Sequence, residues 1–233
     1  MRKLYSVVLA RHGQSIWNHD SKFTGWTNIP LTDYGRKDAY DISQCLKQYK
    51  LIPTIFFSSV LDRSIETAKI VKKHINPKKT LFTSWRLNEN HYGTLEGINR
   101  SYIREEYGDK FTNMMRNNFY MKPPVLNNLP NDYEEGKYSI FKNCYYNSIK
   151  YGESKENVLQ RLLPYFENDI LYTLTDNELP IVVTHKHCIR VLMKHYLQLN
   201  DNEFETFNVT EKNLIIFYFD DNFKYVKYNV ISY

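Results

Sequence analysis

The first apolar run of the chain ends at Arg11, His12 and Gly13, so that a histidine stands between an arginine and a glycine. An imidazole that is largely unprotonated near neutral pH is a competent nucleophile. The neighbouring guanidinium can bind two phosphoryl oxygens at once, and the glycine would let the backbone approach a ligand. A lone histidine at a strand end can also be a capped structural residue, so the tripeptide by itself leaves both interpretations open.

Polar residues that could share a site with His12 follow two later apolar runs. Arg63 comes shortly after the run at 54–59, and His185 comes directly after the run at 180–184. In α/β sheets, ligands bind beyond the carboxyl ends of the strands, where loops and helix N-termini converge. The sequence therefore predicts that the two histidines and Arg63 meet in one crevice.

Hydrophobic periodicity predicts strands that alternate with helices along most of the chain. Short apolar runs rich in Val, Ile and Phe predict strands, and apolar residues at helical spacing predict helices. The predicted strands cover 5–10, 54–59, 180–184, 214–219 and 224–231, and the predicted helices cover 33–49, 63–74, 154–171 and 189–198. This order is typical of an α/β fold with three layers, in which helices cover both faces of a mostly parallel sheet.

A polar, tyrosine-rich and turn-prone segment at about 85–150 interrupts this alternation, with Pro123-Pro124 near its middle. We interpret it as an insertion with some helix that the main domain carries. A chain of 233 residues is long enough for one sizeable core. The prediction is therefore a single domain over 1–233.

Composition and charge exclude several other classes of protein. The net charge of +5 is modest, and no run of like charges gives support for nucleic-acid binding. The three cysteines, Cys45, Cys144 and Cys188, have no metal-type spacing and are expected to be reduced thiols. No apolar stretch approaches 18 residues, so no membrane span is expected. The first residues run directly into a strand pattern without room for a signal peptide, which predicts a cytoplasmic protein.

Four ordered blocks of sequence together carry a family resemblance. They are Arg11-His12-Gly13-Gln14-Ser15 with Trp17-Asn18 and then Phe23-Thr24-Gly25-Trp26; Ser58-Ser59-Val60-Leu61-Asp62-Arg63; Trp85-Arg86-Leu87-Asn88-Glu89 with His91-Tyr92-Gly93; and Val183-Thr184-His185. In this order they closely resemble the histidine phosphatase superfamily, and more narrowly its cofactor-dependent phosphoglycerate mutase branch. The similarity extends in patches to about residue 230.

The resemblance implies a role for each matching residue. His12 would accept the phosphoryl group, while Arg11, Arg63 and His185 would stabilise charge on its oxygens during transfer. Glu89 would be the general acid and base, protonating the leaving alkoxide and deprotonating the acceptor hydroxyl. The implied substrate-binding residues are Asn18, Thr24, Gly25, Tyr92, Arg100 and Arg116. The implied primer is 2,3-bisphosphoglycerate, no metal is expected, and the implied assembly is a homo-oligomer, either a dimer or a tetramer.

The sequence departs from the pattern of the branch at four places. Asn90 stands where an arginine is usual, and Arg116-Asn117 stands where the branch usually has two consecutive arginines. His185-Lys186-His187 replaces His-Gly-Asn, and Thr210-Glu211-Lys212-Asn213 replaces a Pro-Thr-Gly turn. A hydrogen bond to a charged group contributes about 1.5–3 kcal/mol, so the loss of two guanidiniums could weaken binding of a phosphoglycerate by ~10²-fold or more.

These departures leave three hypotheses. The first is a mutase that interconverts 3-phosphoglycerate and 2-phosphoglycerate through a phosphohistidine at His12, and the intact Glu89 block favours it. The second is a phosphatase on the same fold, in which water accepts the phosphoryl group; the missing arginines favour it. The third is a non-catalytic binding or regulatory protein, and the intact catalytic set argues against it.

Overall fold

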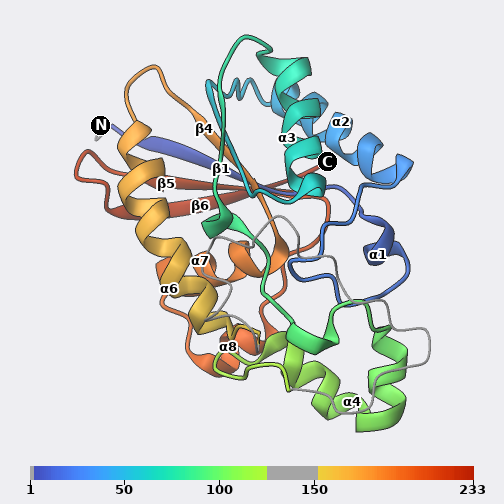
Figure 1. Ribbon diagram of the computed structural model, residues 1–233. Helices are drawn as coiled ribbons and strands as arrows, with labels where there is room; N and C mark the ends of the chain where they lie inside the picture. Colours follow the sequence, from blue (N-terminus) through green and yellow to red (C-terminus); the bar gives the residue numbers. More distant parts are fainter. Residues whose placement is uncertain (1–2, 125–151) are drawn as a thin grey trace.

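A six-stranded sheet forms the middle layer of the molecule, with the strand order β3-β2-β4-β1-β5-β6. The computed structural model describes residues 3–124 and 152–233 (Figure 1). The strands are β1 (Tyr5–Arg11), β2 (Ile55–Ser58), β3 (Leu81–Thr83), β4 (Pro180–Thr184), β5 (Asn213–Phe219) and β6 (Tyr225–Ser232). The sequence pattern missed β3, because a run of three residues is too short to show periodicity.

Parallel pairing brings the ends of β1, β2 and β4 to one edge of the sheet. β4 pairs in parallel with both β1 and β2, and the register sets Arg11 beside Thr184. The backbone N–H of His12 donates to the carbonyl of Thr184 at 2.9 Å, so the chain leaves both strands side by side. β5 and β6 run antiparallel to their neighbours, which makes the sheet mixed. The predicted α/β class is confirmed.

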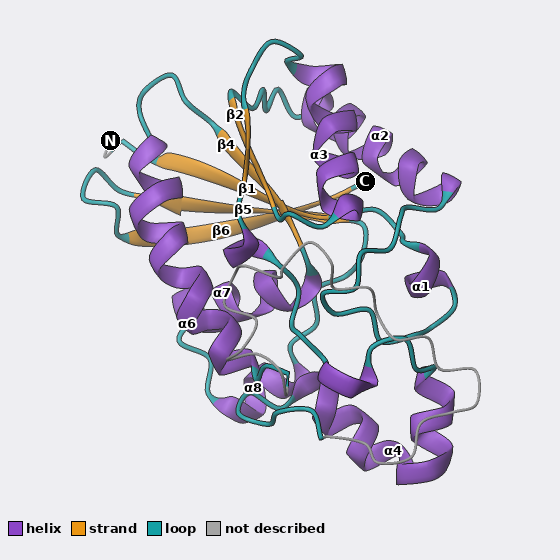
Figure 2. Cartoon of the chain, viewed as in Figure 1, coloured by secondary structure: helices purple, strands orange, loops and turns teal. Residues whose placement is uncertain are grey.

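Helices cover both faces of this sheet (Figure 2). α2 (Asp33–Gln48) and α3 (Asp62–Ile75) lie on one face, and α6 (Lys155–Tyr165) and α7 (Lys186–Leu197) lie on the other. Side chains of β1 alternate between two cores. Val8 and Ala10 pack in the core beneath α2 and α3, whereas Val7 and Leu9 pack in the core beneath α6 and α7.

Local capping sets where the helices begin. The hydroxyl of Thr32 accepts a hydrogen bond from the N–H of Gly35 at the start of α2, as an N-cap does. α7 begins at Lys186, three residues before the predicted start, because His185 already has the extended conformation of an N-cap. The predicted helix at 154–171 is α-helical to Tyr165 and then continues as a π-helical turn (Phe166–Ile170) and a 3₁₀ turn (Leu171–Thr173).

The segment that interrupts the alternation is described up to residue 124. It contains two 3₁₀ turns (Trp85–Leu87 and Gly93–Leu95) and α4 (Arg100–Asn117), which supply the predicted helix. The remainder of the predicted insertion, with Cys144, lies outside the described residues. Cys45 and Cys188 are free thiols. Two further short helices, α1 (Ile16–His19) and α8 (Asp201–Thr206), were not predicted.

Among residues 3–124 and 152–233, none of the helices is both long and apolar enough to cross a bilayer.

Candidate active site

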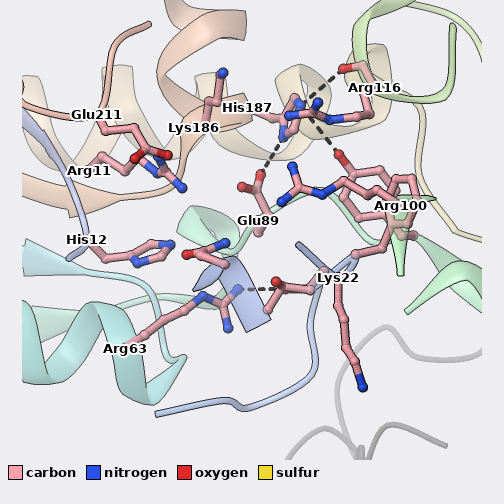
Figure 3. Close-up of a pocket in the computed structure, with 15 residues that line it drawn as sticks. Arg11, His12, Lys22, Arg63, Glu89, Arg100, Arg116, Lys186, His187 and Glu211 are labelled. Carbon is pink, nitrogen blue, oxygen red and sulfur yellow. Dashed lines mark hydrogen bonds and ion pairs between the residues drawn. The ribbon is translucent and has the colours of Figure 1, made fainter. Parts of the chain in front are cut away.

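A pocket opens where β1 and α7 meet the loops before α4 (Figure 3). Its volume is about 600 Å³ when its open mouth is included. It is lined by all but one of the predicted catalytic and substrate-binding residues: Arg11, His12, Asn18, Thr24, Gly25, Arg63, Glu89, Tyr92, Arg100 and Arg116. The remaining lining residues are Lys22, Phe23, Lys186, His187 and Glu211. The fold therefore brings residues more than 170 positions apart in the sequence to one site.

His12 is held as a neutral nucleophile. Its Nδ1 lies 2.6 Å from the carbonyl oxygen of Gly13, which can only accept, so Nδ1 carries the proton and Nε2 keeps its lone pair. Burial, then the charges of Arg63 and Arg11, hold the pKa of His12 well below its ordinary value. The imidazole is therefore unprotonated at neutral pH, which is the form that can attack phosphorus.

Gly13 has a different role from the one that the sequence suggested. It does not line the pocket; a side chain at this position would place its Cβ 2.1 Å from the carbonyl oxygen of Gly35. Glycine is required because two backbone segments pack directly against each other here. This close packing fixes the Gly13 carbonyl that orients His12.

His185 is the predicted residue that does not line the pocket. It is fully buried, and its ring contacts that of His12 edge-on, with 4.8 Å between the centroids. Its Nε2 lies 2.8 Å from the hydroxyl oxygen of Ser59, whereas its buried Nδ1 has no hydrogen-bond partner. Burial, then Arg63 and His12, hold the pKa of His185 well below its ordinary value. His185 therefore supports the His12 ring as a neutral group.

The two arginines beside His12 are anchored differently. Arg63 is buried and donates from Nη1 to the carbonyl of Thr27 at 2.9 Å and from Nη2 to that of Gly25 at 2.7 Å. Burial lowers the pKa of Arg63 to about 10, which leaves it a cation at neutral pH. Arg11 donates from Nη1 to the carboxylate of Glu211 at 2.5 Å. Each side chain thus keeps a fixed position beside the nucleophile.

Several buried polar atoms around His12 have no partner. They are Nε of Arg11, Nε of Arg63, Oγ1 of Thr24 and Nδ1 of His185. A buried donor without an acceptor costs about 1–3 kcal/mol, and native structures keep few of them. A phosphoryl group is rich in acceptor oxygens and would satisfy the donors among them, so this end of the pocket fits such a group.

Glu89 lies in the middle of the pocket with its backbone tightly held. Its carbonyl accepts hydrogen bonds from Nε1 of Trp26 at 2.6 Å and from Nη2 of Arg161 at 2.9 Å. Its Oε1 accepts from the N–H of Asn90 at 2.8 Å and lies 3.1 Å from Nδ1 of His187. Burial would raise the pKa of Glu89, but the charge and hydrogen bond of His187 and the N–H of Asn90 outweigh it and hold that pKa well below its usual value.

Positive charge lines the far side of the pocket from His12. Arg100 and Arg116 face the cavity there, with Glu89 between them and His12 (Figure 3). Burial, then the charge of Arg116, lowers the pKa of Arg100. Burial, then Arg11 and Arg116, lowers the pKa of Lys186 to about 8. Cations that lower one another's pKa form a site for anions, because a bound anion relieves their repulsion.

Neither asparagine that replaces an arginine lines the pocket. Asn90 is buried and donates from Nδ2 to the carbonyl of His91 at 3.2 Å. Oδ1 of Asn117 accepts from Nη1 of Arg190 at 3.1 Å. Lys186, one of the departures beside His185, lines the pocket, and so does Lys22, which the sequence interpretation did not consider because its position does not distinguish it from a surface lysine.

Glu211 is paired with Arg11 inside the pocket, so an anion that binds Arg11 there would compete with its carboxylate. The carboxylate is largely exposed, and Arg11 holds its pKa below the usual value. An incoming phosphate must displace it, so Glu211→Gln is expected to tighten binding of orthophosphate about two- to fivefold, the size expected for one solvent-screened ion pair. Isothermal titration calorimetry measures this change. Glu167→Gln, the same replacement outside the pocket, is the control. Weaker binding of orthophosphate by the Glu211 variant would show that Glu211 does not compete with phosphate for Arg11.

The fold and this pocket are those of an α/β protein with a neutral histidine beside a cluster of cations at the carboxyl edge of its sheet. A model of the histidine phosphatase superfamily (branch 1) matches residues 7–231. The chain belongs to that superfamily.

Relatives and solved structures agree with this assignment. The 2,3-bisphosphoglycerate-dependent phosphoglycerate mutase of Bifidobacterium longum is 34% identical over 96% of this chain and 89% of its own. The enzyme of the same name from Buchnera aphidicola is 35% identical over 97% of each chain. Among solved structures, a mycobacterial glucosyl-3-phosphoglycerate phosphatase superposes with a TM-score of 0.72 at 19% identity over 99% of each chain. At that identity, the structural likeness shows the fold alone.

Proposed function

We propose that the protein is a phosphoglycerate mutase that interconverts 3-phosphoglycerate and 2-phosphoglycerate through a phosphohistidine at His12. The observation that carries this proposal is the division of the pocket. His12, Arg11 and Arg63 lie on one side of Glu89, and Arg100 and Arg116 lie on the other (Figure 3). A small substrate with an anionic group at each end fits such a pocket, and the names of the relatives at 34–36% identity support the same assignment.

In the first half of the reaction, His12 acts as the nucleophile and Glu89 as the proton donor. The lone pair on Nε2 of His12 attacks one phosphorus of 2,3-bisphosphoglycerate, and the N–P bond forms as the bond from that phosphorus to the ester oxygen breaks, which leaves a monophosphoglycerate. Arg11 and Arg63 stabilise the charge on the transferred oxygens. The carboxyl group of Glu89 gives a proton to the departing alkoxide.

The second half reverses these roles. Glu89, now a carboxylate, removes a proton from the free hydroxyl of a bound 3-phosphoglycerate, and that oxygen attacks the phosphoryl group on His12 to give 2,3-bisphosphoglycerate. The bisphosphate reorients and returns the phosphoryl group at position 3 to His12 by the first half-reaction, which releases 2-phosphoglycerate. Arg100 and Arg116 would hold the carboxylate of the substrate while it reorients. As the primer, 2,3-bisphosphoglycerate would be held by the same two arginines and by Arg11, and it supplies the phosphoryl group that first modifies His12.

A phosphatase is the second candidate, because Asn90 and Asn117 stand where the branch usually has arginines and neither reaches the pocket. Fewer guanidiniums would hold the glycerate less firmly, which would give water time to accept the phosphoryl group. The residues around His12 serve both reactions equally well.

An assay with 3-phosphoglycerate separates the two candidates. The protein is incubated with and without 2,3-bisphosphoglycerate, and both 2-phosphoglycerate and free phosphate are followed. The mutase predicts isomer that depends on the primer and at least about tenfold less phosphate than isomer, a difference of about 1.4 kcal/mol in the partition of the phosphoenzyme. Free phosphate without isomer would instead identify a phosphatase.

A homo-oligomer is part of the same proposal. Size-exclusion chromatography with light scattering tests it, with a mass of two or four chains as the expected result.

A further inference from the structure

His187 contacts the general acid and base directly, and this inference from that contact rests on the proposed function. His187 is the second residue of α7 and is buried, with Nδ1 3.1 Å from Oε1 of Glu89. The pattern of the family branch has an asparagine at this position. An asparagine could donate a hydrogen bond to the carboxylate, but its amide cannot take up a proton.

The other ring nitrogen of His187 also faces oxygen atoms. Nε2 lies 3.1 Å from the carbonyl oxygen of Arg116 and 3.4 Å from the hydroxyl of Tyr92. A neutral ring donates from Nδ1 to Glu89 and accepts from the hydroxyl at Nε2. A charged ring donates to Glu89 and to the Arg116 carbonyl. The same position therefore provides partners for both protonation states of His187.

The groups that surround His187 come from every element packed against it. Burial, together with the charges of Lys155 on α6 and Arg190 on α7, lowers the pKa of His187 to about 4 against the opposing effect of Glu89. Arg116 on α4 and the phenol of Tyr92 complete the set. Without a ligand the ring is therefore neutral and Glu89 is a carboxylate. A doubly charged phosphate ester in the pocket adds negative charge beside the pair, which favours uptake of one proton.

We propose that Glu89 and His187 act as a dyad that shares the proton given to the leaving alkoxide, with His187 as the positioning residue. With the ester bound, the dyad holds one dissociable proton, either on the carboxyl of Glu89 or as an imidazolium beside the carboxylate. When the P–O bond breaks, Glu89 passes this proton to the ester oxygen. If the proton was on His187, Nδ1 first returns it to Glu89. The acceptor hydroxyl restores it to the dyad in the second half-reaction.

The dyad has a consequence for the pH dependence of the first half-reaction. Two sites that share one proton hold it to higher pH than either site alone. Transfer requires the protonated dyad, so its rate falls as pH rises through the dyad's shared pKa in the complex. His187→Asn keeps a hydrogen-bond donor toward Glu89 but removes the second site. In this variant the transfer rate should begin to fall at a pH about one unit lower. At pH values above this fall, transfer should be about tenfold slower than in the unaltered protein, and at lower pH the two rates should be equal.

Single-turnover phosphorylation of His12 as a function of pH tests this inference. Two donors are compared: 2,3-bisphosphoglycerate, whose alkoxide needs a proton, and p-nitrophenyl phosphate, whose phenolate leaves without one. For His187→Asn the falling limb of the rate should shift with 2,3-bisphosphoglycerate and stay in place with p-nitrophenyl phosphate. His187→Gln serves as a second variant should the first fold poorly. His195→Asn, the same replacement at the exposed end of α7, should change neither profile.

The possible results of this experiment distinguish a failure of the dyad from a failure of the proposed function. A rate lowered by one factor at every pH and for both donors would assign His187 a purely structural role and overturn the dyad. An unchanged profile would overturn it as well. If the mutase and phosphatase proposals were both wrong, 2,3-bisphosphoglycerate would not phosphorylate His12 in the unaltered protein either, which is a different observation and would remove the basis of the dyad.

Discussion

His12→Ala is expected to lower the rate of phosphoryl transfer by about 10⁴-fold or more, because the loss of a covalent nucleophile removes the intermediate through which both half-reactions pass. The surrounding structure should change little. His12 contributes one buried ring at the end of β1, and the cations that bind the ester, Arg11 and Arg63, have their own anchors in Glu211 and in backbone carbonyls. Stopped assays with 3-phosphoglycerate and binding of orthophosphate measure the two effects separately.

A matched replacement at another histidine shows whether the loss of phosphoryl transfer is specific to His12. His19→Ala removes an exposed histidine from α1, seven positions along the chain, and should retain full turnover. Turnover by His12→Ala within tenfold of the unaltered protein would mean that the phosphoryl group passes directly between substrate and acceptor, without His12.

Glu89→Gln is expected to slow turnover of 3-phosphoglycerate by about 10²- to 10⁴-fold, the usual contribution of a general acid and base. The amide has the same shape, and its oxygen can still accept from the N–H of Asn90 and from Nδ1 of His187. The Michaelis constant should therefore stay within about threefold of its original value, because the substrate binding that we propose for Arg100 and Arg116 does not depend on the proton. Steady-state kinetics separate the two constants.

The leaving group gives a second readout for Glu89. Phosphorylation of His12 by p-nitrophenyl phosphate needs no proton donor, so Glu89→Gln should leave that single step nearly unchanged. Glu105→Gln on the exposed face of α4 is the matched control. A rise in the Michaelis constant with no loss of turnover would assign Glu89 to substrate binding and remove it from proton transfer.

Much of the fold could be predicted because the signals were local. The runs that end at Ala10 and Thr184 are long enough to show buried strands, and parallel pairing follows from the helices between them. The register then sets Arg11 beside Thr184, which is why two distant histidines meet. β3 was missed because it has only three residues. α7 begins earlier than predicted because tertiary contacts hold His185 in an extended conformation.

The candidate site was predictable in its ordered blocks and less so in its loops. The blocks around His12 and Glu89 give residue types at fixed spacing, so the pocket contains the groups that they predict. Glu211 and Lys22 come from loops without periodicity, and only the folded chain shows that one contacts Arg11 and the other lines the cavity. The contact of His187 with Glu89 joins residues 98 positions apart, and no pattern within either segment indicates it.

The central claim is that His12 itself carries the phosphoryl group between donor and acceptor. The most direct measurement is mass spectrometry of the protein after a brief reaction with 2,3-bisphosphoglycerate, quenched in alkali and digested. The account predicts one added phosphate on the peptide that contains His12, lost in acid and discharged by 3-phosphoglycerate as fast as turnover. A phosphate on another residue, or full turnover with His12 unmodified, would contradict it.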